Sequence, residues 1–327
     1  MSESVSFADI EAAAQRLDGL AVVTPVIENA ALNAACGGRV LLKPECLQRT
    51  GSFKFRGAYN RIAQLDAAEL EAGVVAWSSG NHAQGVAAAA ALLGTRATIV
   101  MPHDAPRMKL QRTLELGAEV VGYDRFSEDR EAIARNIAQR SGAALVPSYD
   151  HPDVIAGQGT CGLEFTRQLD SLGVTLDSLL VCCGGGGLIS GVATAFAERS
   201  PVTSLFSVEP AEFDDTARSL VAGERLANPA GARSICDALL AEQPGALTFA
   251  INQQLLSGGL SVSDDQVRAA MRFAFEHLKL VVEPGGAVAL AAVLSGKHDC
   301  RNQAVGVVIS GGNVDAADYA AVLRQTG

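Results

Sequence analysis

Short β-branched runs alternate with longer helical patterns along most of this chain, and this alternation restricts its fold more than any other feature. The expected strands are residues 40–43, 74–77, 98–101, 120–121, 144–146, 179–182, 205–208 and 305–309. The expected helices include one opened by a capping box at Ser6 and Asp9, residues 53–65 capped by Ser52, 81–93, 106–116, one capped by Ser127, 153–169 and 263–277. The alternation predicts an α/β fold whose mainly parallel sheets are covered by helices. Ligands in such folds bind beyond the carboxyl ends of the strands.

The length of the chain suggests two domains. It has 327 residues, against roughly 150 residues for a typical domain. No repeat, low-complexity tract or linker divides the sequence, so we expect the two domains to be interleaved along it. The smaller domain is expected at residues 74–147 and the larger one at residues 1–73 and 148–327.

Composition excludes several classes of protein. With 48% hydrophobic and 19% charged residues, the chain is expected to fold as an ordered globule. Its net charge of −10 argues against nucleic-acid and anionic-membrane partners. No apolar run reaches the roughly 18 residues of a membrane span, and the N-terminus lacks the basic and apolar regions of a signal peptide. We therefore expect a soluble, cytoplasmic protein.

The motifs of several common chemistries are absent from the sequence. There is no GxGxxG, GxxxxGK(S/T), GxSxG or HExxH segment, so dinucleotide redox chemistry, nucleotide hydrolysis, serine hydrolysis and zinc catalysis have no motif to support them. The seven cysteines include no CxxC pair. A disulfide scaffold or a structural zinc site is therefore not expected.

Four consecutive glycines, Gly184–Gly187, follow an apolar strand and precede a helix that begins near Leu188. Their backbone N–H groups are not screened by side chains, and a helix N-terminus favours an anion. The run therefore suits a phosphate monoester. Alternatively, it is a sharp strand-to-helix turn packed closely against a neighbour, although one or two glycines would suffice for a turn.

Lys54 is one of only five lysines and lies between Phe53 and Phe55 at the start of a helix. An apolar setting should lower its pKa and make the neutral, nucleophilic amine more available. Beside a phosphate pocket, such an amine suits covalent attachment of pyridoxal 5′-phosphate (PLP). Alternatively, the ammonium group reaches solvent, as most such lysines do.

Other polar groups also follow expected strands. The segment from Ser78 to His82 offers two hydroxyls and an amide for a carboxylate or a ring oxygen, or else forms an ordinary capping turn. Ser310 is suited to a hydrogen bond with a ring nitrogen, or marks a turn. Glu209 and Asp215 suit a hard cation such as Mg²⁺ or Ca²⁺, or belong to a solvated acidic loop.

Taken in order, these segments resemble one family. The motifs GSFKFRGA (51–58), SSGNHAQG (78–85), AGQGT (156–160), GGGGL (184–188), VEP (208–210) and SGGN (310–313) match the fold-type II PLP enzymes. Within that group the chain is similar to the threonine/serine dehydratase and serine racemase family. The resemblance implies the tryptophan synthase β-like fold, with two interleaved domains and PLP bound by the larger one.

The resemblance also implies roles for individual residues. Lys54 would anchor the cofactor and remove the α-proton of the substrate, and Ser79 would be the acid/base on the opposite face. PLP would be bound by Phe53, Lys54, Asn81, Gly184, Gly185, Gly186, Gly187, Leu188 and Ser310, with the phosphate on the glycines and the ring nitrogen at Ser310. Mg²⁺ or another divalent cation would be held by Glu209, Asp215 and the carbonyl group of Phe213.

The implied activity is β-elimination of water from an L-3-hydroxy amino acid, above all L-threonine or L-serine, by a carbon–oxygen lyase that yields a 2-oxo acid and ammonia. The expected substrate-binding residues are Ser78, Ser79, Asn81, His82 and Arg130. Arg130 suits the second carboxylate of 3-hydroxyaspartate, or is a solvated helix residue. Serine racemase, a 3-hydroxyaspartate or phenylserine dehydratase, and a catalytically silent PLP- or phosphate-binding regulator remain open. A homodimer is the family expectation.

Overall fold

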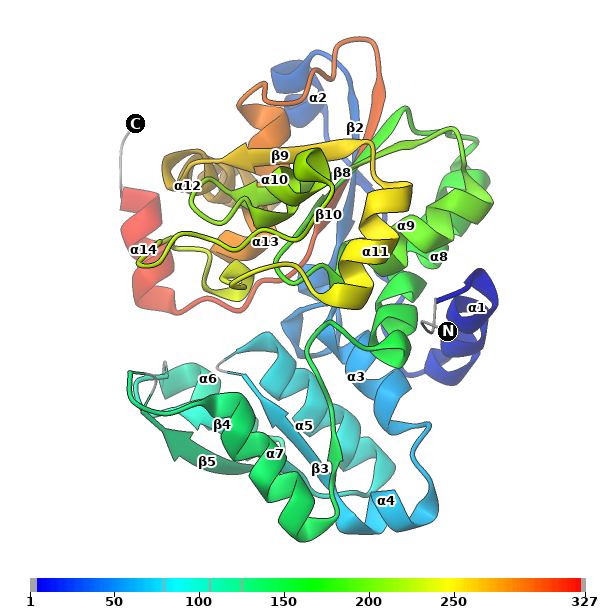
Figure 1. Cartoon of the computed structure of the whole chain (residues 1–327). Coiled ribbons are helices and arrows are strands. Elements are labelled where there is room, and N and C mark those ends of the chain that lie inside the picture. Colours follow the sequence, from blue (N-terminus) through cyan, green and yellow to red (C-terminus); the bar gives the residue numbers. More distant parts are fainter. Residues whose placement is uncertain (1–4, 79, 106, 125, 325–327) are drawn as a thin grey trace.

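The computed structural model describes residues 5–324, except residues 79, 106 and 125. Two sheets organise the chain, one in the upper and one in the lower half of Figure 1. The six-stranded sheet has the order β1-β2-β10-β7-β8-β9, and the four-stranded sheet has the order β5-β4-β3-β6. All described neighbours are parallel except β1 and β2. The predicted α/β fold with mainly parallel sheets is confirmed.

The strands of the six-stranded sheet are β1 Ile27–Glu28, β2 Arg39–Pro44, β7 Ser178–Cys182, β8 Ser204–Pro210, β9 Gly258–Val262 and β10 Ala304–Ile309. Those of the four-stranded sheet are β3 Val74–Trp77, β4 Ala97–Pro102, β5 Glu119–Tyr123 and β6 Ala144–Leu145. The four strands of the second sheet follow one another in the chain, whereas the first sheet takes strands from both sides of them. The domain boundaries 1–73 with 148–327 and 74–147 stay a prediction.

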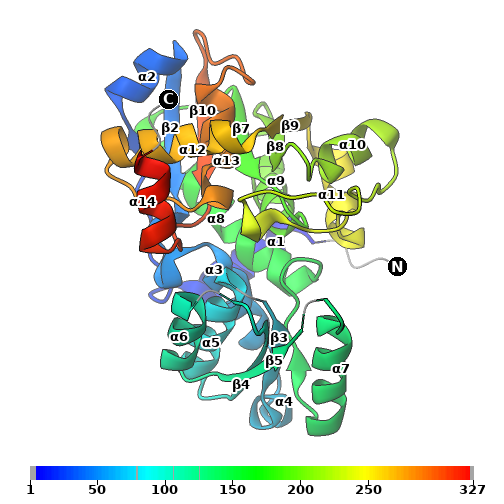
Figure 2. The ribbon, with the colours of Figure 1, turned by 90° about the vertical axis from the view of Figure 1, so that its left-hand side faces the viewer.

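Helices cover both sheets. They are α1 Phe7–Leu17, α2 Ala30–Cys36, α3 Lys54–Ile62, α4 Ala67–Ala72, α5 Asn81–Leu93, α6 Arg107–Glu115, α7 Arg130–Ser141, α8 Pro152–Leu172, α9 Gly187–Arg199, α10 Asp215–Ala222, α11 Ala246–Leu255, α12 Asp264–Phe273, α13 Pro284–Leu294 and α14 Ala316–Arg324. Shorter turns are η1 Glu45–Leu47, η2 Arg49–Gly51, η3 Asp237–Leu239 and η4 Ala274–Leu278. Figure 2 shows α5 and α6 on one face of the four-stranded sheet and α7 on the other. None of the described helices has the length and apolar character that a membrane crossing requires.

Two large hydrophobic cores lie against the sheets. The first packs α13 and α9 against the six-stranded sheet. The second joins buried side chains of α3, such as Phe55 and Ile62, to Val86 of α5 and Ile99 of β4. Helix α3 therefore contributes to the core of the four-stranded sheet, although it lies outside residues 74–147.

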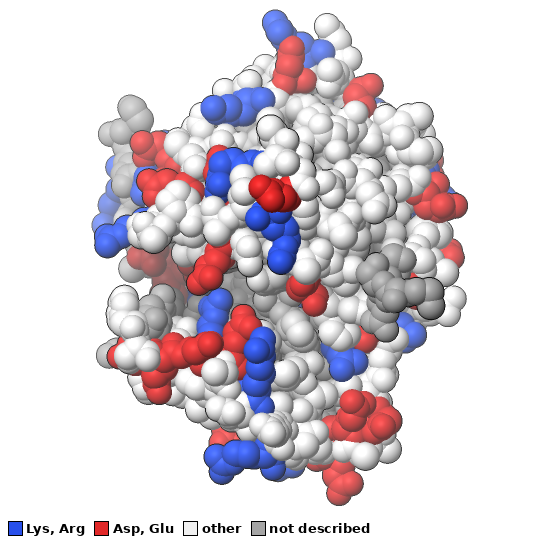
Figure 3. Space-filling model, viewed as in Figure 1, with Lys and Arg blue, Asp and Glu red and all other residues white. Residues whose placement is uncertain are grey.

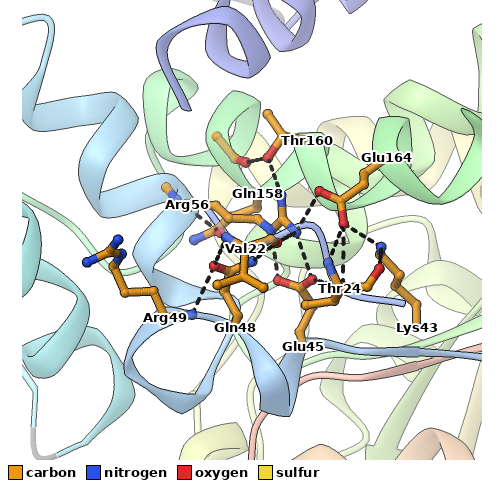
Figure 4. A network of polar contacts seen from close by, with 12 residues as sticks. Val22, Thr24, Lys43, Glu45, Gln48, Arg49, Arg56, Gln158, Thr160 and Glu164 are labelled. Atoms are coloured by element: carbon orange, nitrogen blue, oxygen red, sulfur yellow. Dashed lines mark hydrogen bonds and ion pairs between the residues drawn. The ribbon is translucent and has the colours of Figure 1, made fainter. Parts of the chain in front are cut away.

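A buried ion network holds α3 between β2 and α8 (Figure 4). Arg56 donates to both carboxylate oxygens of Glu45, at 2.7 and 2.8 Å, and to Oε2 of Glu164 at 3.1 Å. Lys43 donates to Oε1 of Glu164 at 2.5 Å and to the carbonyl oxygen of Thr24 at 2.8 Å. Two cations thus balance two carboxylates, and they fix the helix turn that begins at Lys54.

The structure confirms the capping box at Ser6 and corrects two other predicted caps. Ser6 Oγ accepts from the Asp9 N–H, and the Asp9 carboxylate accepts from the Ser6 N–H. Ser52 does not cap α3, because it lies in extended backbone bridged to Gly311 and the helix begins after Phe53. Ser127 does not cap α7: its hydroxyl donates to Asp124 at 2.9 Å, and Asp129 caps the helix instead.

The helix predicted over residues 263–277 was correct in position but is not uniform. Its α-helical part, α12, ends at Phe273, and a π-helical turn, η4, continues to Leu278. The sequence pattern did not indicate β1, β9, α2, α4, α10, α11 and α13.

Candidate active site

A cavity of about 380 Å³ brings together residues from both halves of the molecule. Its lining includes the predicted residues Phe53, Lys54, Ser78, Asn81, His82, Arg130, Gly184, Gly185, Gly186, Gly187, Leu188 and Ser310. Figure 3 shows the surface hollowed between the two halves, with charged side chains of both signs at the rim. The cavity has the size of a small-molecule site, and it lies where β3, β7 and β10 end. The structure therefore places the separate motifs on one cavity.

Lys54 presents its amine to this cavity from the first turn of α3. Its Nζ atom donates to the carbonyl oxygen of Ser148 at 2.8 Å and lies 5.1 Å from the centre of the Phe53 ring. Burial lowers the pKa of Lys54 to about 8, although Cys182 and Glu283 act in the opposite direction. A lysine with this pKa is neutral in about one molecule in ten at pH 7, far more often than an ordinary lysine, and the neutral amine is the form that acts as a nucleophile or proton acceptor.

The four glycines form a loop into which other parts of the chain pack closely. A Cβ atom on Gly185 would lie 2.4 Å from the Tyr149 ring, and one on Gly187 would lie 2.9 Å from Cα of Tyr149. Gly186 has φ +96°, a conformation that favours glycine. It is also the N-cap of α9 and has no side-chain capping hydrogen bond. Close packing therefore explains part of the run, and the same loop leaves backbone N–H groups at a helix N-terminus beside the cavity.

Asn81 and His82 open α5, and both side chains are buried and hydrogen-bonded. Asn81 Nδ2 donates to Glu283 Oε1 at 2.6 Å, and Asn81 Oδ1 accepts from Asn313 Nδ2 at 2.8 Å. The His82 Nε2 atom lies 2.8 Å from the carbonyl oxygen of Val146. Burial, with the nearby Lys54, lowers the pKa of His82 to about 3, so the ring is neutral. His82 lines the cavity as an uncharged group.

Ser78 and Ser310 also lie at the cavity, at the ends of β3 and β10. The Ser78 hydroxyl accepts from the Gly80 N–H at 3.1 Å, and the Ser310 carbonyl accepts from the Phe53 N–H at 3.1 Å. The Ser310 side chain contacts the thiol of Cys182, whose pKa burial raises to about 11. Ser79 lies outside the described residues, so its predicted role stays a prediction.

Several residues that line the cavity or support its lining were not predicted. Lys109 of α6 forms an ion pair with Asp237 of η3, joining the two halves beside the cavity. Tyr149 covers the glycine loop, and Glu283 holds Asn81. Of these residues, only Lys109 had a feature in the sequence that could have drawn attention to it, because lysine is rare in this chain.

The predicted cation ligands lie apart from the cavity lining. Both oxygens of Glu209 accept backbone N–H groups at the start of α10, from Thr216 at 2.9 Å and Ala217 at 2.8 Å. Asp215 Oδ1 accepts from Asn228 at 2.6 Å, while its Oδ2 atom is buried without a hydrogen-bond partner. Burial raises the pKa of Asp215 to about 6 and, with the Asp215 charge, raises that of Glu209 well above its ordinary value.

These two carboxyl groups fit a cation only with added ligands. Hard oxygen donors and an unpartnered buried oxygen suit a divalent cation. The part of the chain that the structure describes contains no group of three or more histidine, cysteine or acidic side chains arranged to hold a metal. Backbone carbonyls or water would have to complete the site.

A family model described as "Pyridoxal-phosphate dependent enzyme" matches residues 17–311. The chain belongs to this family. It is 48% identical over 324 residues to an L-threo-3-hydroxyaspartate ammonia-lyase of a Pseudomonas species, with 98% of each chain covered. It is 39% identical to a serine racemase of Schizosaccharomyces pombe, again with 98% of each chain covered. The solved structure of a threonine deaminase of T.th. superposes with a TM-score of 0.90 at 43% identity, covering 95% of this chain and 99% of that one.

Membership of this family confirms the predicted fold type and makes PLP the cofactor of the enzyme. The cavity fits PLP on its own geometry. It offers a lysine amine of lowered pKa, and it offers a glycine loop in which side chains would clash with Tyr149. It also offers an amide and a hydroxyl within the same lining. The amine suits the aldehyde of PLP, the glycine loop suits its phosphate, and the amide and the hydroxyl suit the polar atoms of its ring.

Proposed function

We propose that this enzyme eliminates water from an L-3-hydroxy amino acid and releases a 2-oxo acid and ammonia. The observation that carries the proposal is the placement of the Lys54 amine and the glycine loop on one cavity. The relatives support it, since they are named as an L-threo-3-hydroxyaspartate ammonia-lyase and a threonine deaminase. When bound, PLP supplies an electron sink conjugated to the substrate α-carbon.

Lys54 would attach the cofactor and then take the α-proton at Nζ, for which a pKa of about 8 is suitable. Backbone N–H groups of Gly184–Gly187 and Leu188 would hold the phosphate, and Phe53 would pack against the ring. Asn81 would donate to the ring 3-oxygen. Ser310 would face the ring nitrogen, where a hydroxyl does not enforce protonation as a carboxylate would.

The bond changes balance as a dehydration followed by hydrolysis. The Cα–H and Cβ–O bonds break, and the hydroxyl leaves as water with a proton. The resulting enamine takes up water, so that the C–N bond breaks and ammonia and a 2-oxo acid form. The relatives are named for this C–N cleavage, whereas the carbon–oxygen class expected from the sequence describes the first step.

We propose L-threo-3-hydroxyaspartate as the preferred substrate, ahead of threonine and serine. Arg130 is exposed on the cavity from the start of α7, with Tyr149 in the same lining. A guanidinium group there suits a second carboxylate, because it offers a fork of two N–H donors. The 48% identity with a hydroxyaspartate ammonia-lyase supports the same choice.

The test compares substrates in one assay. Formation of 2-oxo acid is measured with L-threo-3-hydroxyaspartate, L-threonine, L-serine and L-phenylserine, using the wild type and Arg130→Ala. The variant should lose at least tenfold in kcat/KM for hydroxyaspartate and less than threefold for serine. Equal losses on both substrates would contradict the role of Arg130 in binding the second carboxylate. No 2-oxo acid from any of the four substrates would contradict the proposed elimination reaction.

We also propose that Glu209, Asp215 and the Phe213 carbonyl bind a divalent cation such as Mg²⁺. The unpartnered Asp215 Oδ2 atom and the raised pKa values of both carboxyl groups support it, because a cation would relieve their repulsion. Mg²⁺ should raise the melting temperature of the wild type but not that of Asp215→Asn. Equal responses of the two proteins would contradict this site.

The location, the oligomeric state and the domain boundaries of the enzyme are also open to test. We propose a homodimer, as the family resemblance implies. We also propose a cytoplasmic location, which the composition favours, and a small domain at residues 74–147, which the strand–helix pattern favours. Light scattering on a size-exclusion column measures the mass, and a monomeric mass would contradict the dimer. Limited proteolysis followed by mass spectrometry tests whether cleavage concentrates near residues 73 and 148.

A further inference from the structure

Two thiols that lie more than 260 residues apart in the chain, Cys36 and Cys300, are neighbours in the structure. Cys36 is the last residue of α2, and Cys300 lies in the loop that leads into β10; Figures 1 and 2 show this loop beside α2. Both are free thiols, and their side chains are in hydrogen-bonding contact. Cys36 is half-buried, whereas Cys300 is 2% exposed. One member of the pair is therefore within reach of a reagent in solution.

Backbone hydrogen bonds hold the two segments that carry these thiols against each other. The Arg39 N–H donates to the Gln303 carbonyl oxygen at 2.8 Å. The Asn302 N–H donates to the Gly37 carbonyl oxygen at 3.3 Å. From there β2 and β10 pair in parallel, beginning with Arg39 opposite Ala304. The contact between the two thiols is therefore set by the pairing of two strands of the sheet.

Two glycines directly after Cys36 allow this close approach. A Cβ atom on Gly38 would lie 1.7 Å from the Cys300 carbonyl oxygen, so no side chain fits at that position. Gly37 has φ +69° and ends α2 in the left-handed conformation, which glycine adopts without strain. The Cys–Gly–Gly segment thus turns the chain from α2 into β2 against the backbone of Cys300.

The contact makes the two thiols chemically unequal. The hydrogen bond with Cys300 lowers the pKa of Cys36, against the opposing effect of burial. The same contact, together with burial, raises the pKa of Cys300. Among the cysteines of the described residues, Cys36 is the only one whose pKa lies below its ordinary value. Because the thiolate is the attacking form in thiol–disulfide exchange, Cys36 is the thiol that reacts first.

We propose that Cys36 and Cys300 form a reversible disulfide site that is oxidised by a low-molecular-weight disulfide. The Cys36 thiolate attacks one sulfur of the oxidant, whose S–S bond breaks, so that one small thiolate leaves and a mixed disulfide remains on Cys36. The Cys300 thiol then loses its proton and attacks the sulfur of Cys36, and the second small thiolate leaves. Two protein thiols are oxidised, and one small disulfide is reduced to two thiols.

The bond joins the starts of two strands whose far ends lead to the cavity and to the buried ion network. Strand β10 ends immediately before Ser310, and β2 ends immediately before Glu45. Each strand has six residues, which span about 20 Å, so the disulfide forms away from the cofactor cavity. Closing so long a loop restricts the unfolded chain, and the oxidised enzyme is therefore the more stable form. In a reducing compartment the site stays as two thiols.

The test equilibrates the PLP-loaded enzyme with mixtures of reduced and oxidised glutathione. Free thiols are then blocked by alkylation, and trypsin releases Cys36 on residues 17–39 and Cys300 on residues 298–301. Mass spectrometry without reduction should find these two peptides joined. Their yield should rise with the oxidised fraction and fall again when reduced glutathione is restored. The melting temperature of the wild type should rise by about 5 °C or more on oxidation.

Cys36→Ser and Cys300→Ser should each lose both the joined peptide and the rise in melting temperature. Cys46→Ser is the matched control and should keep both, because Cys46 is the other half-buried cysteine of the described residues. A wild type without the joined peptide at any glutathione ratio, or a glutathione adduct that persists on Cys36 beside a free Cys300, would overturn the proposal. So would a Cys36→Ser variant that keeps the rise in melting temperature. The peptide measurement uses the wild type alone, so it holds even if a serine variant does not fold.

Discussion

The buried network around Arg56 gives a prediction whose size and pH dependence can both be calculated. Replacing Arg56 by methionine keeps an unbranched side chain in place but removes three hydrogen bonds to carboxylates. Glu45 is fully buried and would lose its main cation, leaving only Lys43 nearby. Breaking a buried pair in this way costs about 3–5 kcal/mol of unfolding free energy.

The pH dependence follows from the pKa of Glu45. Burial alone would raise it, but Arg56, Lys43 and Thr24 together hold it below its ordinary value. In the wild type this carboxylate therefore contributes stability above the unfolded-state pKa, and that stability is lost as pH falls through the folded-state pKa. In Arg56→Met the pKa of Glu45 should rise above the unfolded value, so acidification should recover stability.

Urea unfolding at pH 7.5 and pH 5.5, with saturating PLP, measures both effects. We expect a deficit of about 3–5 kcal/mol at pH 7.5 and a smaller one at pH 5.5. Arg199→Met is the matched control, since Arg199 pairs with Asp170 at 2.7 Å on the surface and should cost less than about 1 kcal/mol. A deficit below 1 kcal/mol for Arg56→Met, or one that grows on acidification, would refute the reasoning.

Two further predictions concern the cofactor site. Because the pKa of Lys54 is about 8, the rate at which cofactor-free enzyme takes up PLP should rise about tenfold per pH unit below pH 8 and then level off. Stopped-flow absorbance measures this rate, and a rise that continues beyond pH 9.5 would indicate an unshifted lysine. Gly187→Ala should weaken PLP binding at least tenfold, because its Cβ would lie 2.9 Å from the Tyr149 backbone. Gly258→Ala, whose nearest contact would be 3.6 Å, is the control in the same titration and should leave affinity within twofold.

The sequence was sufficient to predict the parts of the site that lie in short contiguous motifs. Lys54, Asn81, the four glycines and Ser310 each follow a strand or open a helix. Parallel strands bring their carboxyl ends to one edge of a sheet, so the glycines after β7 and Ser310 after β10 lie at the same edge of the six-stranded sheet. Asn81 follows β3 of the other sheet and lines the same cavity. The parallel topology therefore makes local patterns informative about three-dimensional placement.

The sequence did not indicate the site residues that reach the cavity through long-range packing, because they do not lie in such motifs. Glu283 and Tyr149 stand alone in the sequence, and only the approach of α13 and of the segment before α8 brings them to Asn81 and the glycine loop. Helix α13 was missed because it is apolar on nearly all sides and has no 3.6-residue period. Strand β9 was missed because it begins with two glycines, which are poor strand formers.

The predicted caps failed for a related reason. Ser52 and Ser127 are good capping residues by type, but their surroundings decide their conformation. Ser52 bridges to Gly311, more than 250 residues away along the chain. Ser127 is engaged by Asp124, so Asp129 caps the helix instead. Local preference placed both helices to within a few residues and could not choose the capping group.

The most direct test of the central claim is a paired assay of product and cofactor with L-threo-3-hydroxyaspartate. The PLP-loaded wild type should release 2-oxo acid and ammonia in equal amounts. Lys54→Ala should lose both this turnover and the visible band of covalently bound PLP. An intact band with no 2-oxo acid from hydroxyaspartate, threonine, serine or phenylserine would contradict the proposed elimination. It would indicate a PLP-binding protein instead.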